Sequence, residues 1–193
     1  SLVIESGLGA VTVTEVLVFH NSTADKIDTS TRPLVQKLPA GIENFRMMDS
    51  KSGNSMKHQL EKNVLKIAYI FPRGSTQIIY QYILPAWFGG LEINREFEHS
   101  LDVVGVFTPI ERLQIKSDEL SFSGKQNLNE TTFLTWKNKA SASNRLNFKI
   151  RNVPTTSLQY AGVSVIILVL LFSTVALFYR QRLTKKNKNM VAL

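Results

Sequence analysis

Arg145–Arg151 reads RLNFKIR, and this stretch decides the fold class. Leu146, Phe148 and Ile150 alternate with polar or charged residues, so they lie on one face of an extended chain. Strict alternation of this kind indicates a β-strand with one buried face and one face in water. We therefore expect the segment to belong to a sheet that covers a core on one side only.

The same period of two recurs in the chain before this strand. Glu15 interrupts the apolar face of an early strand that contains Val11, Val13, Leu17 and Phe19. Further candidate strands are Gly41–Met48, Gly90–Phe97, Leu101–Phe107, Glu111–Lys116 and Thr131–Trp136. Polar loops separate the strands, and the clearest are Asn21–Thr31, Asp49–Ser55 and Ser123–Glu130. Roughly eight to ten short strands predict an all-β, antiparallel β-sandwich, with a barrel as the alternative.

Two runs, Val64–Phe71 and Thr76–Leu84, are apolar on both faces and are the best candidates for central strands. The sequence Phe71-Pro72-Arg73-Gly74 joins them, with Pro and Gly at the positions that a type I turn prefers. The turn predicts that the two runs are adjacent antiparallel strands.

C-terminal to these strands, the chain carries no charge from Asn152 to Tyr179. Tyr160–Tyr179 reads YAGVSVIILVLLFSTVALFY, which is long enough as a helix to cross a hydrocarbon layer of about 30 Å. We expect a single transmembrane helix here, and the alternative is a buried core helix. The predicted organisation is an exported domain at 1–151, a tether at 152–157, the membrane helix at 158–179 and a tail at 180–193.

The tail holds five basic residues and no acidic one, which favours a cytoplasmic C-terminus. The chain begins at Ser1 without Met, as expected after removal of a signal peptide. Without the five tail charges the formal charge of +8 falls to +3, so no nucleic-acid partner is expected. The lack of cysteine favours a bacterial cytoplasmic membrane with a periplasmic domain. The glycosylation patterns at Asn21 and Asn129 keep an endoplasmic-reticulum membrane with a lumenal domain as the alternative.

The order of turns and strands also carries a resemblance. Phe19-His20-Asn21-Ser22, Lys37-Leu38-Pro39-Ala40-Gly41 and Phe71-Pro72-Arg73-Gly74, followed by Ile79-Tyr80-Gln81-Tyr82, resemble bacterial envelope proteins with carboxypeptidase-regulatory-like β-sandwich domains. The resemblance covers roughly Val11–Leu84 and implies a non-enzymatic, immunoglobulin-like or transthyretin-like fold. It implies no substrate and no site residues.

Candidate chemistry is sparse. The densest group of possible metal ligands is Glu92, Glu96, Glu98, His99 and Asp102, which could hold a hard cation or form a solvated strand face; we favour the strand face. No nucleophile elbow or phosphate-binding glycine pattern is present, so we expect no enzyme and no cofactor. Trp87 and Phe88 form either a docking knob or an inward-packed corner, and we favour the corner.

Two sets of residues are candidate contacts at the membrane. Lys149, Arg151, Arg180 and Arg182 flank the uncharged run as membrane-proximal basic residues. Lys149 and Arg151 either meet lipid phosphates or an acidic partner surface, or simply belong to a solvated strand face. About five residues separate Arg151 from the helix, which limits the distance to roughly 18 Å. One helix face is small at both ends and is predicted to pack on a partner helix; it consists of Gly162, Ile166, Val169, Ser173 and Ala176.

The sequence therefore predicts a non-catalytic accessory or structural subunit of a bacterial membrane complex. Its partners would be the lipid bilayer and other integral membrane subunits, with no small-molecule ligand. The alternative is a membrane-anchored module that binds cell-wall sugar or peptide in a groove lined by Trp87, Phe88 or Trp136.

Overall fold

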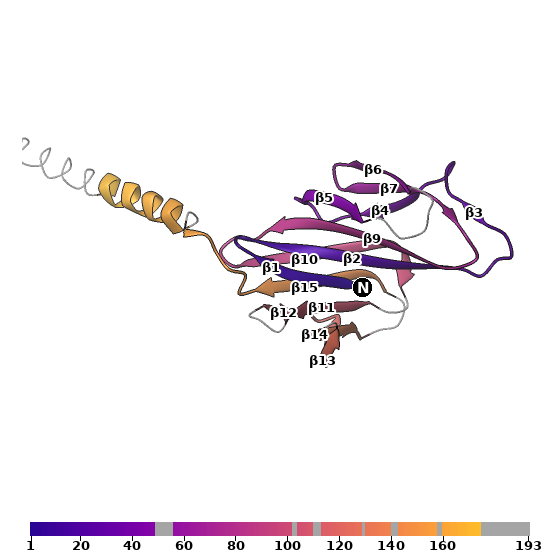
Figure 1. Cartoon of the computed structure of the whole chain (residues 1–193). Coiled ribbons are helices and arrows are strands. Elements are labelled where there is room, and N and C mark those ends of the chain that lie inside the picture. Colours follow the sequence, from indigo (N-terminus) through magenta and orange to yellow (C-terminus); the bar gives the residue numbers. More distant parts are fainter. Residues whose placement is uncertain are drawn as a thin grey trace, which may run out of the picture. The chain divides into compact units, whose positions relative to one another are not determined.

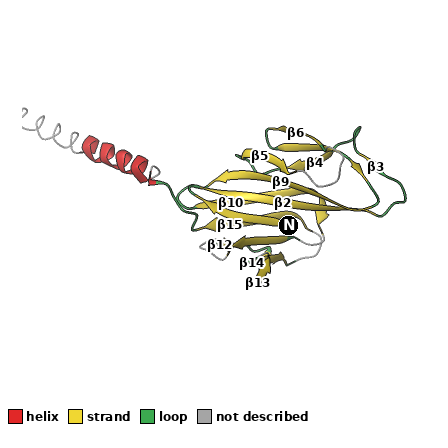
Figure 2. Cartoon of the chain, viewed as in Figure 1, coloured by secondary structure: helices red, strands yellow, loops and turns green. Residues whose placement is uncertain are grey.

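A computed structural model describes residues 1–48, 56–101, 104–109, 113–128, 130–139, 143–157 and 160–174 (Figure 1). The chain divides into two units, Ser1–Thr155 and Thr156–Leu193. Within the described residues the first unit holds all of the strands, which Figure 2 draws as yellow arrows.

The larger sheet of the first unit has seven strands in the order β13-β14-β11-β1-β2-β9-β5. Their bounds are β1 Leu2–Gly7, β2 Ala10–Asn21, β5 Glu43–Met48, β9 Gly74–Pro85, β11 Gly105–Pro109, β13 Leu120–Leu128 and β14 Thr131–Asn138. Neighbouring strands are antiparallel except for β1 and β11, which run parallel. The β2–β9 pair is the longest ladder and runs from Ala10 opposite Pro85 to Asn21 opposite Gly74.

The second sheet has six strands in the order β12-β15-β10-β4-β7-β6. Their bounds are β4 Leu34–Lys37, β6 Lys57–Glu61, β7 Val64–Ala68, β10 Gly90–Leu101, β12 Gln114–Lys116 and β15 Ser143–Arg151. A separate two-stranded ribbon joins β3 Ile27–Asp28 to β8 Ile70–Phe71.

The core lies between the two larger sheets, because each contributes alternate side chains to one buried cluster. The seven-stranded sheet supplies Leu2, Ile4, Val11, Val13, Ile78, Tyr80 and Tyr82, and the six-stranded sheet supplies Leu65, Ile67, Ile93, Leu146, Phe148 and Ile150. The predicted all-β, sandwich-like architecture is therefore confirmed for this unit. The RLNFKIR segment lies in β15 with its apolar face buried, as the alternation predicts.

Two predictions about the strands are wrong. β7 pairs with β4 and β6, whereas β9 pairs with β2 and β5, so the two most apolar runs lie in different sheets. The chain passes between the sheets through β8 instead of turning back in one hairpin. Ser123–Glu130 was expected to be a loop, but most of it belongs to β13, whose exposed residues pair with β14.

The second unit contains a helix at residues 160–174, all of which are exposed. No helix in the part of the chain that the structure describes is both long and apolar enough to cross a membrane. Residues 158–159 and 175–179 of the predicted span, and the predicted tail at 180–193, lie outside the described residues.

Candidate functional site

The most polar spot in the core is an ion pair between Glu15 of β2 and Arg95 of β10, which joins the two sheets. Arg95 Nε lies 2.9 Å from Glu15 Oε1 and 3.2 Å from Oε2, and neither side chain is exposed. Charges buried in this way are tolerated only when both are paired and fully hydrogen-bonded. The sequence analysis missed the pair because it treated Glu15 as an interruption of the apolar face.

Hydrogen bonds complete the shell around both charges. Tyr82 and Tyr80 donate their hydroxyl groups to Glu15 over 2.6 and 2.8 Å. Arg95 donates to the hydroxyl oxygen of Tyr80, to the side chain of Gln36 and to the backbone carbonyls of Lys37 and Glu96. Its guanidinium also lies 4.6 Å from the centre of the Phe97 ring.

The shell shifts the pKa of three of these groups. Burial raises the pKa of Tyr80 and Tyr82 well above the usual value of a phenol, and the negative charge of Glu15 adds to the effect. Burial is the largest single influence on Arg95 and opposes its charge, but Glu15, Tyr80 and Tyr82 together leave the pKa of Arg95 above its ordinary value. Since the network has no exposed side-chain surface at its centre, it acts on the fold by fixing β2, β9, β10 and β4 together.

A polar groove of about 500 Å³ is lined by residues of the six-stranded sheet and of neighbouring loops. Three asparagines line it, namely Asn63, Asn94 and Asn147. Glu96 lies between Lys37 at 3.2 Å and Arg145 at 3.3 Å, and the hydrogen bond from Lys37 lowers the pKa of Glu96. The arrangement offers amides and opposite charges to a polar ligand.

Two of the candidate acidic metal ligands, Glu92 and Glu96, are paired with basic side chains instead. Glu96 has the two partners just described, and Glu92 lies 3.6 Å from Lys149. Glu98 is exposed, whereas the His99 side chain and Asp102 lie outside what the structure describes. Within the described residues no three metal-binding side chains converge. Glu92 and Glu96 thus belong to a charge-balanced strand face.

Three chain segments meet at one end of the first unit. Gly9 donates its backbone N–H to the carbonyl of Pro154 over 2.7 Å, and Ala86 donates to the carbonyl of Gly9 over 2.8 Å. Val153 donates to the carbonyl of Gly89 over 3.0 Å. These bonds tie the β1–β2 turn and the β9–β10 turn to the segment that follows β15.

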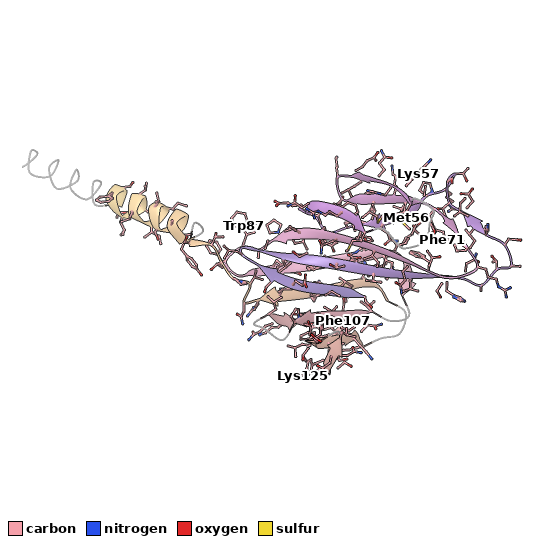
Figure 3. All side chains as sticks on the ribbon, in the orientation of Figure 1. Met56, Lys57, Phe71, Trp87, Phe107 and Lys125 are labelled. Atoms are coloured by element: carbon pink, nitrogen blue, oxygen red, sulfur yellow. The ribbon has the colours of Figure 1, made fainter. Side chains whose placement is uncertain are left out.

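The side chains at this end are apolar and exposed. Leu8 is 71% exposed, Trp87 72% and Phe88 57%, and we call this group the apolar tip. Figure 3 shows the labelled Trp87 at the end of the sheets, on the side where the β1–β2 turn lies. The prediction that Trp87 and Phe88 pack inward is wrong. Trp87 pairs with Gly90 across the turn that contains Phe88, both aromatic side chains are exposed, and the buried residue of this loop is Ala86.

The predicted basic residues lie partly at the same end. Arg151 is opposite Gly90 in the β10–β15 ladder, directly at the base of the Trp87–Gly90 turn, and it is exposed. Lys149 lies two pairs further along, opposite Glu92, and contacts it. Arg180 and Arg182 lie outside the described residues.

Gly162, Ile166, Val169 and Ser173 of the predicted packing face all lie in the described helix and are exposed, and Ala176 lies outside it. The hydroxyl group of Ser173 donates to the carbonyl of Val169 over 2.7 Å, and that of Ser164 donates to the carbonyl of Tyr160 over 2.9 Å. These bonds satisfy the hydroxyl donors within the helix, so neither serine needs an acceptor from outside it.

Trp136 does not share a surface with the apolar tip. It is half-buried on β14 and packs against Phe122 of β13, with ring centres 5.4 Å apart. The polar groove described above is lined by none of Trp87, Phe88 and Trp136. The aromatic groove that the sequence suggested is thus not this polar groove.

Comparison with protein-family models and with curated proteins finds no match to this chain. The resemblance to carboxypeptidase-regulatory-like envelope domains stays a prediction.

Proposed function

We propose that the chain is a single-pass protein of a bacterial cytoplasmic membrane, in which a non-catalytic β-sandwich serves as an accessory subunit of a membrane complex. The sandwich lies on the exported side, and the helix packs on helices of partner subunits. The lipid bilayer and other integral membrane proteins are its partners.

The observation that carries the proposal is the all-round apolar surface of the helix at residues 160–174. Val165, Ile166, Ile167 and Leu168 are each exposed, and successive residues point about 100° apart around a helix of 3.6 residues per turn. A helix that is apolar on every side needs an apolar environment. The uncharged sequence continues beyond the described helix to Tyr179, which gives the segment the length of a span.

The helix itself provides a matched pair of variants to test partner packing. Ser164 and Ser173 each return their hydroxyl group to the helix backbone, but they lie nine positions apart and therefore on opposite faces. Ser173→Leu enlarges the small-residue face, whereas Ser164→Leu makes the same chemical change on the other side. Packing on a partner predicts that only Ser173→Leu displaces the chain from its complex.

The measurement is native gel electrophoresis of membranes extracted with a mild detergent. The wild type and Ser164→Leu should migrate in a high-mass species, and Ser173→Leu should shift toward the free chain. If the wild type migrates only as the free chain, the accessory-subunit proposal is wrong. Equal shifts for both variants would contradict the choice of packing face.

The groove on the six-stranded sheet favours one second candidate, a membrane-anchored module that binds cell-wall sugar or peptide. Its asparagines and the Lys37–Glu96–Arg145 array suit a ligand rich in hydroxyl or amide groups. Titration calorimetry with soluble cell-wall fragments tests this candidate, with Asn94→Ala as the variant. Binding heat that the wild type shows and Asn94→Ala lacks would support this candidate. A wild type without binding heat would reject it.

A further inference from the structure

We propose that the apolar tip, Leu8, Trp87 and Phe88, inserts into the headgroup region of the lipid bilayer and fixes the orientation of the sandwich at the membrane. This inference rests on the proposed membrane anchor and adds a second attachment to it. Four observations support it: the exposure of the tip, its unusual turn, the place where the chain leaves the domain, and the exposed Arg151 beside the tip.

The tip collects large apolar side chains where no core requires them. Leu8 and Trp87 are each more than two-thirds exposed, although their turns are held together by the Ala86–Gly9 hydrogen bond. Scattered apolar residues are ordinary on a surface, but an exposed cluster of them on one end marks a contact site. Trp is also the residue that prefers the boundary between lipid and water.

The backbone of the tip gives the second argument. Trp87 and Gly90 exchange both backbone hydrogen bonds, at 3.0 and 3.1 Å, and enclose Phe88 and Gly89 as a two-residue turn. Both enclosed residues have positive φ, 50° for Phe88 and 77° for Gly89. Such a turn prefers Asn or Gly at the place of Phe88, because a bulky residue is strained there. An exposed Phe in this position opposes local stability and indicates a functional role.

The path of the chain supports the lipid bilayer as the surface that the apolar tip contacts. Val153 and Pro154 are bonded into the tip, and the first unit ends at Thr155. Only five residue steps separate Thr155 from Tyr160 in the apolar helix, so the chain between them spans at most about 18 Å. The segment that we assign to the bilayer therefore begins within a few residues of the point where the chain leaves the tip.

The positive charge of Arg151, beside the apolar tip, also suits contact with a lipid bilayer. Arg151 is exposed at the base of the Trp87–Gly90 turn and can contact lipid phosphates. A combination of Trp, Phe and Leu with a neighbouring Arg is the composition of interfacial membrane-binding segments.

The two tryptophans of the chain make the test direct. The full chain is reconstituted into vesicles of phosphatidylcholine and phosphatidylglycerol, in one variant with Trp87 alone (Trp136→Phe) and in another with Trp136 alone (Trp87→Phe). Spin-labelled lipids quench fluorophores in the bilayer, and acrylamide quenches those in water. Vesicle flotation in alkaline carbonate first measures whether the anchor holds the chain.

We expect blue-shifted emission from Trp87 with strong quenching by lipids labelled near the headgroup, and no lipid quenching of Trp136. Phe88→Asn, made in the Trp87-only variant, should keep or raise the melting temperature and reduce the lipid quenching of Trp87. A chain that floats while Trp87 responds only to acrylamide overturns the tip inference and leaves the anchor standing. A chain that carbonate releases from the vesicles overturns both.

Discussion

Glu15 and Arg95 place opposite charges between two sheets, where neither side chain contacts water. Their contribution to stability depends on being together, because desolvation of each charge offsets most of the attraction. The same reasoning gives Tyr80 and Tyr82 their role, since their hydroxyl groups bind carboxylate oxygens that would otherwise lack donors.

Removing one partner of the buried pair should be costly. Glu15→Gln leaves the guanidinium of Arg95 without a counter-charge in the core, and we expect a loss of about 3–5 kcal/mol in the free energy of unfolding. Urea unfolding followed by circular dichroism measures this loss.

Lys149→Gln provides the control, since it breaks the Lys149–Glu92 pair on the exposed face of the same sheet. Exposed pairs contribute little, so this variant should unfold close to the wild type. Equal losses in the two variants would show that the buried pair has no special role.

The raised pKa of Tyr80 and Tyr82 predicts a pH dependence above neutrality. In the unfolded chain these phenols ionise near pH 10, whereas in the folded chain they stay protonated to higher pH. The unfolded state therefore gains stability relative to the folded state as the pH rises above about 10, and this part of the folding free energy is lost.

Tyr82→Phe removes one of the two phenols, so its stability should fall less steeply than that of the wild type between pH 9 and pH 11. Urea midpoints at the two pH values give the comparison. Parallel losses in both proteins would contradict the assignment.

The sequence predicts on which face of its strand each of Glu15 and Arg95 lies, but it does not predict that the two side chains contact each other. Alternation places Glu15 on the face of Val13 and Leu17, and it places Arg95 with Ile93 and Phe97. Two opposite charges on inward faces are a signal for a buried pair. Which strands face each other is set by packing across the sandwich, however, and no local pattern records it.

At the scale of elements, the β9–β10 turn depends on the conformational freedom of Gly89. Its φ is +77°, and a Cβ there would lie 3.1 Å from the carbonyl oxygen of Val153. Gly41 has nearly the same φ, +75°, but has open space around it. Alanine substitutions at these two glycines therefore distinguish the cost of backbone strain alone from the cost of strain plus steric crowding.

Gly41→Ala should cost only the strain of the left-handed backbone, about 1 kcal/mol. Gly89→Ala should cost more, because it also displaces Val153 and weakens the bonds that join the tip to the end of the domain. Thermal unfolding of both variants tests the difference, and an equal or smaller effect at Gly89 would contradict the described packing.

The positions of the strands were easier to predict than the pairing of the strands within the sheets. Arg145–Arg151, Gly90–Phe97 and Thr131–Trp136 alternate clearly and all fall within strands. The predicted pairing of β7 with β9 was wrong because the residues between them cross from one sheet to the other. A turn sequence with Pro and Gly does not reveal such a crossing. β13 was missed because its exposed side chains are mostly polar and resemble a loop.

In the whole molecule, a β-sandwich unit that ends at Thr155 is followed by a unit whose helix at residues 160–174 exposes mostly apolar side chains. The uncharged run predicted a helix from sequence alone, and the described helix lies within that run; its role as a membrane span stays a proposal. The apolar tip could not be predicted in the same way, since its three residues come from two turns that are far apart in the sequence.

The most direct test of the account is alkaline carbonate extraction of membranes from cells that express the full chain. We predict that the wild type stays in the membrane pellet. The Val169→Lys variant, which has a charge at the centre of the apolar segment, should appear in the soluble fraction to a greater extent. A wild-type chain that carbonate releases completely would contradict the claim that this protein is held in a membrane by its helix.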